Sequence, residues 1–411
     1  MTSNVRRILW VRGLRAFGDG YVSLLLPVYL LSLGFTPFEV GVIATGTLLG
    51  SGLLTLTIGL HAYRFRYRAL LLAAAALMTV TGFAFATLQA FWPLLIVAVV
   101  GTLNPSSGDV SVFLPLEHSM LAKIVDDKRR TSIFARYSLV GALVGAAGAL
   151  FAGVPEVITR ELALNARTAY QAMFVLYGVL GIACALIYRR LPAAVESDVE
   201  MPAMPLAQSK RIVYVLAALF SLDAFGGGFI VQSLLALWLY EKYQLSTAVA
   251  GTIFFWTGVF SALSYLAATR IANRIGLVNT MVFTHLPSSV LLILVPFAPS
   301  LGWAVALLLV RSALSQMDVP TRSSYVMAVV EPAERAAAAS VTSVPRSLAS
   351  AASPLIAGYL LQGSTFGWPL IAAGVIKIVY DLLLLANFRA VQPPEERRLS
   401  TISTFDGRAP P

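Results

Sequence analysis

Hydrophobic residues in this sequence gather in about twelve runs of roughly twenty residues, and a helix of that length crosses the hydrocarbon of a bilayer. Lipid offers no partner to an unpaired backbone group, which favours helices, and the alternation typical of barrel strands is absent. The pattern predicts an all-α integral membrane protein of about twelve transmembrane helices. The first run lacks a small-residue cleavage site, so we interpret it as a retained helix. The expected spans are 10–33, 38–60, 69–90, 92–119, 132–154, 167–188, 211–239, 247–269, 278–297, 301–329, 337–361 and 367–388.

The composition agrees with this prediction. Of the 411 residues, 58% are hydrophobic and 12% are charged, whereas soluble proteins carry about 25% charged residues. The net charge is +10, and the basic residues lie between the hydrophobic runs, so membrane topology explains them better than a nucleic-acid partner. Basic residues gather in every second connection, which predicts that both termini are cytoplasmic. We expect a monomer surrounded by lipid in the inner (plasma) membrane of the cell.

Short sequence matches recur at a nearly constant spacing. The segment Phe17–Tyr21 matches Phe225–Phe229, and Asp109 matches Asp318. Two six-helix halves in parallel repeat are a recurrent transporter architecture, with the substrate site where the halves meet. The predicted parts are an N-terminal bundle at 1–188, a cytoplasmic linker at 189–210, a C-terminal bundle at 211–390 and a flexible cytoplasmic tail at 391–411.

The loop after the second predicted helix carries Gly59 and Arg64, and the equivalent loop of the second half carries Asn273, Arg274 and Gly276. In these positions the sequence resembles the major facilitator superfamily, whose signature there is Gly-x-x-x-Asp-Arg-x-Gly. The aspartate of that motif is replaced in both halves. The resemblance covers almost the whole chain, and it implies a secondary transporter built from two pseudo-symmetric six-helix bundles.

The fifth predicted helix contains Gly141-x-x-x-Gly145-x-x-Gly148. One interpretation is close packing of two helices through small residues. The other is the glycine-rich motif that the resemblance associates with antiporters, although Ala146 stands where that motif has proline. Both interpretations stay open at this point.

Charged residues inside the hydrophobic runs are the best indicators of function, because hydrocarbon makes each cost at least about 2.5–3.5 kcal/mol. Arg15 and Asp19 share a face of the first helix. Asp19 is either a proton-titrating site or a permanent partner of Arg15. Asp223 has no charged neighbour at helical spacing, so we expect either a proton-binding group or a partner on another helix. Gly226–Gly228 should loosen or bend that helix near the midplane, as in the discontinuous helices of transporters.

The remaining candidates follow polar stripes on other helices. For proton coupling or gating they are Asp19, Asp223, Asp109, Asp318 and Arg15, and for substrate binding they are Arg311, Arg346, Gln232, Ser106, Ser315 and Trp256. Trp256 fits either an aromatic drug pocket or plain packing. Lys377 and Asp381 form a predicted i, i+4 pair of structural character.

Several classes of site are not indicated. The histidines His61, His118 and His285 are isolated, and no spacing predicts a metal site. No phosphate-binding loop or nucleophile elbow is present, so we expect neither an ATPase nor another enzyme, and no cofactor.

The sequence therefore predicts a secondary active transporter that moves a small solute by alternating access. Proton-coupled efflux of a small organic compound or drug is the preferred hypothesis, with the proton carried by a buried carboxylate. The alternative is uptake or exchange of an organic anion held by Arg15, Arg311 and Arg346. A non-transporting receptor or an intramembrane enzyme is the hypothesis of another class.

Overall fold

The computed structural model describes residues 3–61, 65–106, 112–125, 127–191, 206–331, 334–389 and 391. Within these residues the chain forms α-helices and one short 3-10 helix, and no β-strand. Nine of the described helical segments are long and apolar enough to cross a membrane. The prediction of an all-α membrane protein is confirmed.

The helices of the first half are α1 (Ser3–Ser32), α2 (Pro37–His61), α3 (Tyr67–Thr87), α4 (Phe91–Val100), α5 (Phe113–Ile124), α6 (Asp127–Phe151), α7 (Val154–Leu162) and α8 (Ala166–Tyr188). Those of the second half are α9 (Lys210–Gly228), α10 (Gln232–Tyr243), α11 (Thr247–Ile275), α12 (Leu277–Leu294), η3 (Val295–Phe297), α13 (Leu301–Ser315), α14 (Asp318–Val329), α15 (Arg335–Gly363) and α16 (Trp368–Phe388).

Three of the predicted crossings consist of two helices each: α4 with α5, α9 with α10, and α13 with α14. The break after α9 follows Gly226–Gly228 directly, as predicted. The other two breaks correct the prediction of continuous helices at 92–119 and 301–329. Pro105 and Pro320 each lack the N–H that would bond the carbonyl four residues earlier. Those carbonyls belong to the residues that directly follow the last residues of α4 and α13. With each pair counted once and the short α7 omitted, the described helices make twelve crossings.

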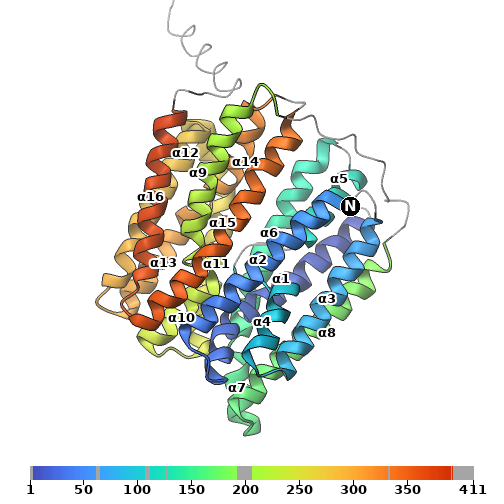
Figure 1. Cartoon of the computed structure of the whole chain (residues 1–411), viewed down its shortest axis with the longest axis vertical. Helices are drawn as coiled ribbons and strands as arrows, with labels where there is room; N and C mark the ends of the chain where they lie inside the picture. Colours follow the sequence, from blue (N-terminus) through green and yellow to red (C-terminus); the bar gives the residue numbers. More distant parts are fainter. Residues whose placement is uncertain are drawn as a thin grey trace, which may run out of the picture.

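Figure 1 shows two bundles side by side, α1–α8 and α9–α16. Along the boundary between the bundles, α2 contacts α15 and α6 contacts α11. We call the face where α1 begins and α16 ends the terminal face; it is at the top of Figure 1. The opposite face, which carries the connections 33–36 and 364–367, is called the far face.

The bundles meet closely near the far face because glycines remove side chains there. A Cβ added to Gly41 of α2 would lie 2.6 Å from the carbonyl oxygen of Pro354 and 2.9 Å from Cα of Gly358 on α15. Likewise, a Cβ on Gly251 of α11 would lie 2.5 Å from the carbonyl oxygen of Ala149 on α6. At these positions only glycine lets the two backbones approach so closely.

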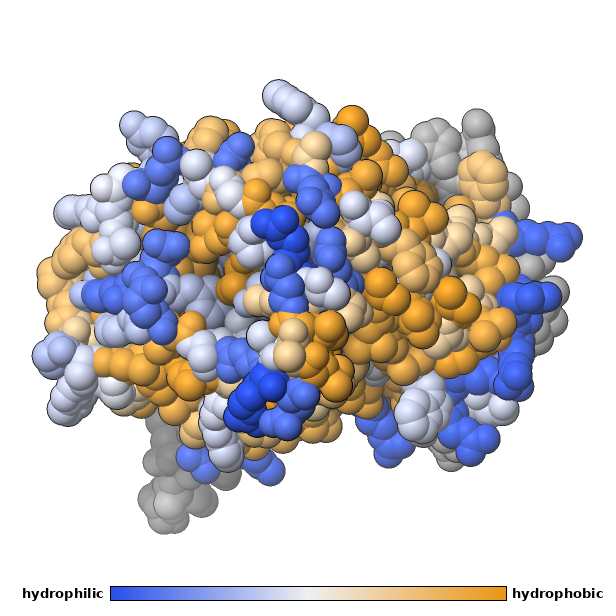
Figure 2. All heavy atoms as spheres, turned by 90° about the horizontal axis from the view of Figure 1, so that it is seen from below, coloured by the Kyte–Doolittle hydropathy of each residue, from blue (hydrophilic) through white to orange (hydrophobic). Residues whose placement is uncertain are grey.

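The apolar cores follow the same division. One core cluster contains residues of both halves, among them Leu25 and Phe85 from the first and Trp238 and Leu292 from the second. Two further clusters each belong to one half. Figure 2, a view of the far face, shows polar side chains over its middle with hydrophobic side chains beside them. The halves therefore share a core on the far-face side.

Candidate functional site

A cavity of about 400 Å³ lies between the two halves. Its lining comes from α1, α6, Asn104 and Ser106 of the first half and from every α-helix from α9 to α16 of the second. The amide nitrogen of Gln232 donates to the hydroxyl of Ser23 at 2.9 Å, which ties α10 to α1 across the boundary. The cavity thus occupies the place that the repeat predicted for the substrate.

Five hydrogen bonds join described residues of the two halves, and they lie in the middle of the molecule or toward the far face. Besides the bond from Gln232 they join Ser233 N–H to Pro105, Tyr240 to Leu24, and both Thr247 and the N–H of Ala248 to Glu156. Glu156 lies on α7, a short helix that the sequence analysis did not predict. The cavity is closed toward the far face by these bonds and by the shared core.

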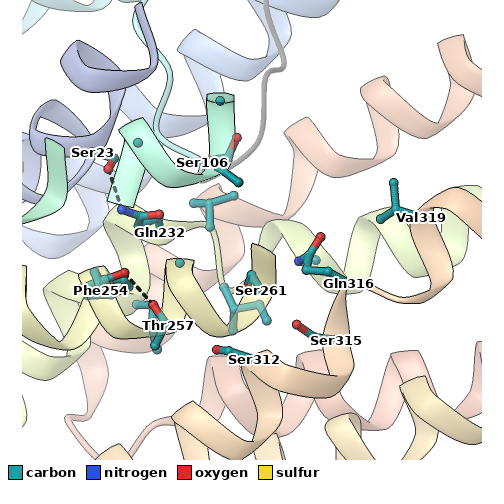
Figure 3. A pocket seen from close by; sticks show the side chains of 18 of the residues that line it. Ser23, Ser106, Gln232, Phe254, Thr257, Ser261, Ser312, Ser315, Gln316 and Val319 are labelled. Carbon is teal, nitrogen blue, oxygen red and sulfur yellow. Dashed lines mark hydrogen bonds between the residues drawn. The ribbon is translucent and has the colours of Figure 1, made fainter. Parts of the chain in front are cut away.

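The neutral part of the lining contains many hydroxyl and amide groups among small and aliphatic residues. Figure 3 shows Thr257 and Ser261 of α11 near Ser312, Ser315 and Gln316. The hydroxyl of Tyr265 donates to the Oε1 of Gln316 at 2.9 Å. These groups can bond a polar solute, and three of the predicted substrate-binding residues, Ser106, Gln232 and Ser315, lie in this lining.

Two cationic side chains of the lining have no acidic partner among the residues that the structure describes. Arg311 on α13 and Arg346 on α15 form no ion pair and no hydrogen bond with any described residue. The Nε of Arg311 is buried without an acceptor. Arg346 is exposed within the cavity lining. A buried polar group without a partner is costly, which disposes Arg311 to accept an anion, and the guanidinium of Arg346 is open to a solute in the cavity.

Asp223 is not isolated, because cations from two other helices contact it. Nη2 of Arg322 on α14 donates to Oδ2 at 2.7 Å, and Nζ of Lys377 on α16 donates to Oδ1 at 2.7 Å. Arg322 also pairs with Asp318 on its own helix. All four side chains are buried and also line the cavity. Asp223 was expected to be either a proton-binding group or a residue with a partner on another helix, and this geometry matches the second interpretation.

The predicted pair of Lys377 with Asp381 is corrected by the structure. Lys377 bonds Asp223, while both carboxylate oxygens of Asp381 lie 3.0 Å from Nδ1 of His285 on α12. His285, which the sequence left isolated, is therefore part of a charged cluster. Its partner is 96 residues away along the chain, so helical spacing gives no signal for it.

The first half contains a separate buried ion pair. Nη2 of Arg15 donates to Oε2 of Glu117 on α5 at 2.5 Å and to the hydroxyl of Tyr137 at 3.1 Å. The hydroxyl of Tyr188 donates to the other oxygen of Glu117 at 2.5 Å. Arg15 therefore has an acidic partner on another helix. Asp19 lines the cavity and accepts a hydrogen bond from Tyr177 at 3.3 Å.

The two ion pairs occupy equivalent places in the repeat with opposite polarity. In the first half the cation Arg15 lies on α1 and the anion Glu117 on α5, the second part of its crossing. In the second half the anion Asp223 lies on α9 and the cation Arg322 on α14. The sequence comparison of the halves did not reveal this, because the matching positions hold unlike residues.

The glycine motif of α6 packs against α1. A Cβ on Gly148 would lie 2.2 Å from the carbonyl oxygen of Phe17, and one on Gly20 would lie 2.2 Å from that of Gly145. A Cβ on Gly141 would meet the guanidinium of Arg12 at 2.1 Å. These close approaches match the packing interpretation of the motif.

The other predicted residues are placed as follows. Trp256 is 48% exposed and outside the cavity lining, because Thr257 and Ser261 face the cavity and Trp256 points the other way on α11. Gly59 lies in α2, whereas Arg64 and Asp109 lie outside the described residues. Asn273 and Arg274 are exposed at the end of α11. Gly276 follows with φ +86°, a conformation that favours glycine.

Comparison with known proteins identifies the fold and its family. The family model described as Major Facilitator Superfamily matches residues 8–222 and again 216–405. This chain belongs to the major facilitator superfamily. It is a multi-pass membrane transporter, and the predicted two-bundle fold is that of the superfamily.

An uncharacterized membrane protein of Saccharomyces cerevisiae is 24% identical to this superfamily member, over 96% of each chain. Among solved structures, the nucleoside transporter NupG is similar with a TM-score of 0.75 and 12% identity, over 93% of this chain and 99% of that one. A bacterial homologue of the human lysosomal transporter Spinster is similar with a TM-score of 0.70 and 14% identity, over 94% and 96%. At these identities the likeness shows the fold alone.

Proposed function

We propose that this transporter carries a small organic anion, which it binds in the central cavity through Arg311 and Arg346. The observation that carries the proposal is the absence of an acidic partner for either guanidinium within the described residues. Guanidinium groups form bidentate, charge-assisted hydrogen bonds with carboxylates and phosphates. An anion between them would satisfy both charges at once.

The charges of the described lining point the same way. Its carboxylates are Asp19, Asp223 and Asp318, and its cations are Arg12, Arg311, Arg322, Arg346 and Lys377. The described lining therefore has two more cations than carboxylates. At about 4 Å and an effective dielectric constant of about 20, two unit charges attract each other by about 4 kcal/mol. This excess favours an anionic solute over the cationic drug-like compounds that an acidic cavity would select.

Asp19 supports a second candidate function, the proton-coupled export preferred from the sequence. Its carboxylate lies in the cavity lining and accepts a hydrogen bond from the hydroxyl of Tyr177 at 3.3 Å. Asp223 is less suited to carry the proton, because Arg322 and Lys377 hold its charged form in place. The basic residues near the terminal face also favour cytoplasmic termini. Because the cavity is closed toward the far face, it would then face the cytoplasm.

A thermal-shift screen with purified protein tests the proposal, because a ligand that binds only the native state raises the unfolding temperature. The panel contains mono- and dicarboxylates, inorganic phosphate, sugar phosphates, neutral sugars and cationic dyes. We expect stabilisation by anions in the native protein, and its loss in Arg311→Gln and Arg346→Gln.

Arg270→Gln is the matched control, because Arg270 is exposed at the end of α11 and outside the cavity lining. This variant should keep the response to anions. Stabilisation by cationic dyes alone, or an anion response that survives both cavity substitutions, contradicts the proposed site.

A further inference from the structure

The charged side chains around His285 form one buried cluster. Nδ1 of His285 contacts Asp381 at 3.0 Å, and its Nε2 lies 3.5 Å from Nζ of Lys377 and 3.6 Å from Oδ1 of Asp223. Asp223 continues the cluster to Arg322, which contacts Asp318. We call these six side chains the His285 cluster. It runs from Asp381, which is fully buried, to the cavity wall.

The contacts of His285 fix which ring nitrogen is available for a further proton. Nδ1 lies 3.0 Å from both oxygens of the Asp381 carboxylate, so Nδ1 carries a hydrogen in the neutral ring as well as in the imidazolium. Nε2 is left to accept or release the second proton. Its two neighbours compete, since Nε2 without a hydrogen can accept from Lys377 and Nε2–H can donate to Asp223.

The charge of the cluster decides between the two states. Asp223, Asp318 and Asp381 supply three negative charges, and Arg322 and Lys377 supply two positive charges. With a neutral imidazole the cluster holds one uncompensated negative charge. All six side chains are buried, and an uncompensated charge in such a place costs several kcal/mol. An imidazolium at His285 makes the cluster neutral.

Within the described residues, no other charged group of the neighbouring elements forms an ion pair with the cluster. The helices that contact α12 are α11, α13, α14 and α16. Their remaining ionisable side chains are Tyr265, Arg270 and Arg274 on α11, Arg311 on α13, Tyr325 on α14 and Tyr380 on α16. Arg270 and Arg274 are exposed at the end of α11, and the tyrosines are uncharged at neutral pH. Arg311, and Arg346 on α15, line the cavity and form no ion pair with the cluster.

From this geometry we infer that His285 is the proton-binding residue of the second half, with its imidazolium as the state present at neutral pH. The proton on Nε2 draws Asp223 toward His285 and away from Lys377, which changes a contact between α9 and α16 at the cavity wall. Insofar as this proton is coupled to transport, the inference rests on the proposed function. The proton site then differs from Asp19 and Asp223, the carboxylates that the sequence indicated.

Nitrogen NMR of the full chain in lipid nanodiscs tests the charge of His285 without any substrate. Only the three histidines are labelled with 15N, and the His285→Gln variant assigns the signal of His285. At pH 7 both ring nitrogens of His285 should give imidazolium shifts. A neutral imidazole spectrum for His285 at pH 7 would overturn the inference.

Three substitutions separate the charge argument from a general disturbance of the site. Asp381→Asn removes one negative charge, so the imidazolium signal of His285 should be lost at pH 7. Lys377→Met removes a positive charge and should retain the signal. Asp19→Asn, in the other half, is the control and should leave it unchanged. Retention in Asp381→Asn or loss in Lys377→Met contradicts the charge argument.

The outcome is independent of the thermal-shift test of the proposed function. If no anion stabilises the protein but the imidazolium is present, the proposed function fails and the proton site stands. If anions bind but His285 is neutral, the proton site fails alone.

Discussion

Closure of the far face depends on the bare backbone at Gly41, and one methyl group there should disturb it. In Gly41→Ala the new Cβ would lie 2.6 Å from the carbonyl oxygen of Pro354 and 2.9 Å from Cα of Gly358. Both contacts are to backbone of α15, which cannot turn aside as a side chain can. Overpacking of this kind costs about 1–3 kcal/mol. The cost falls on the closed far face alone, so the ratio of open to closed states should rise by about 5- to 150-fold.

Gly52→Ala is the matched control for this prediction. Gly52 lies on the same helix and faces the same partner, but its new Cβ would lie 3.8 Å from Cβ of Ser347, an ordinary contact. Both substitutions add one methyl group to α2 and favour its helical state equally. A difference between the two variants therefore reports the close approach to α15.

Labelling of a cysteine in the cavity measures the change. Thr257 suits the reporter Thr257→Cys because its hydroxyl bonds only a carbonyl of its own helix, that of Phe254, at 2.9 Å. Cys184, the only native cysteine, is replaced by alanine. An impermeant maleimide added at the far face should react faster in Gly41→Ala than in Gly52→Ala. Equal rates in the two variants would refute the idea that the glycine contact holds the far face closed.

Three further predictions follow from buried and bonded charges. Glu117→Gln leaves Arg15 with a neutral partner and should lower the free energy of unfolding by about 3–5 kcal/mol, which thermal unfolding measures. The double change Arg15→Met with Glu117→Leu should recover much of this loss. Equal destabilisation of the single and the double variant would contradict the prediction. Asp223→Asn should abolish transport of the anion found in the screen while Arg322 retains Asp318 as a partner, and native transport rates would show that Asp223 is dispensable. Hydrogen bonds from the N–H groups of residues 207–209 hold the pKa of the Glu334 carboxyl below its usual value. The ionised carboxyl of Glu334 therefore contributes fully to stability above about pH 4.5, and this contribution is lost as pH falls through the lowered pKa. The difference in melting temperature between the native chain and Glu334→Gln should shrink accordingly in acid, and a difference that grows in acid would contradict the assignment.

The fold was predictable because its signals are long or repeated. Twelve apolar runs require twelve crossings whatever their neighbours are, and the break after Gly228 follows from three consecutive glycines. The breaks near Pro105 and Pro320 were missed, because each proline lies inside a span long enough for one helix to cross a bilayer. The helix α7 was missed because nine residues are too few to cross a bilayer.

The site was predictable as a set of residues and not as a set of contacts. Arg311, Arg346 and Asp223 were found because charge in an apolar run is rare. Their partners could not be found, since spacing along one helix says nothing about a neighbouring helix. Glu117 and Asp381 lie 102 and 96 residues from Arg15 and His285, which they contact. The i, i+4 rule therefore paired Lys377 with Asp381, whereas Lys377 contacts Asp223.

The shared apolar core on the far-face side has a thermal consequence. No ion pair joins the described residues of the two halves, so closure of this side rests on buried apolar surface, close backbone packing and a few neutral or singly charged hydrogen bonds. Apolar association weakens on cooling, whereas added salt screens only charges. Chilling should therefore populate the conformer open to the far face, and raising ionic strength should leave the balance nearly unchanged.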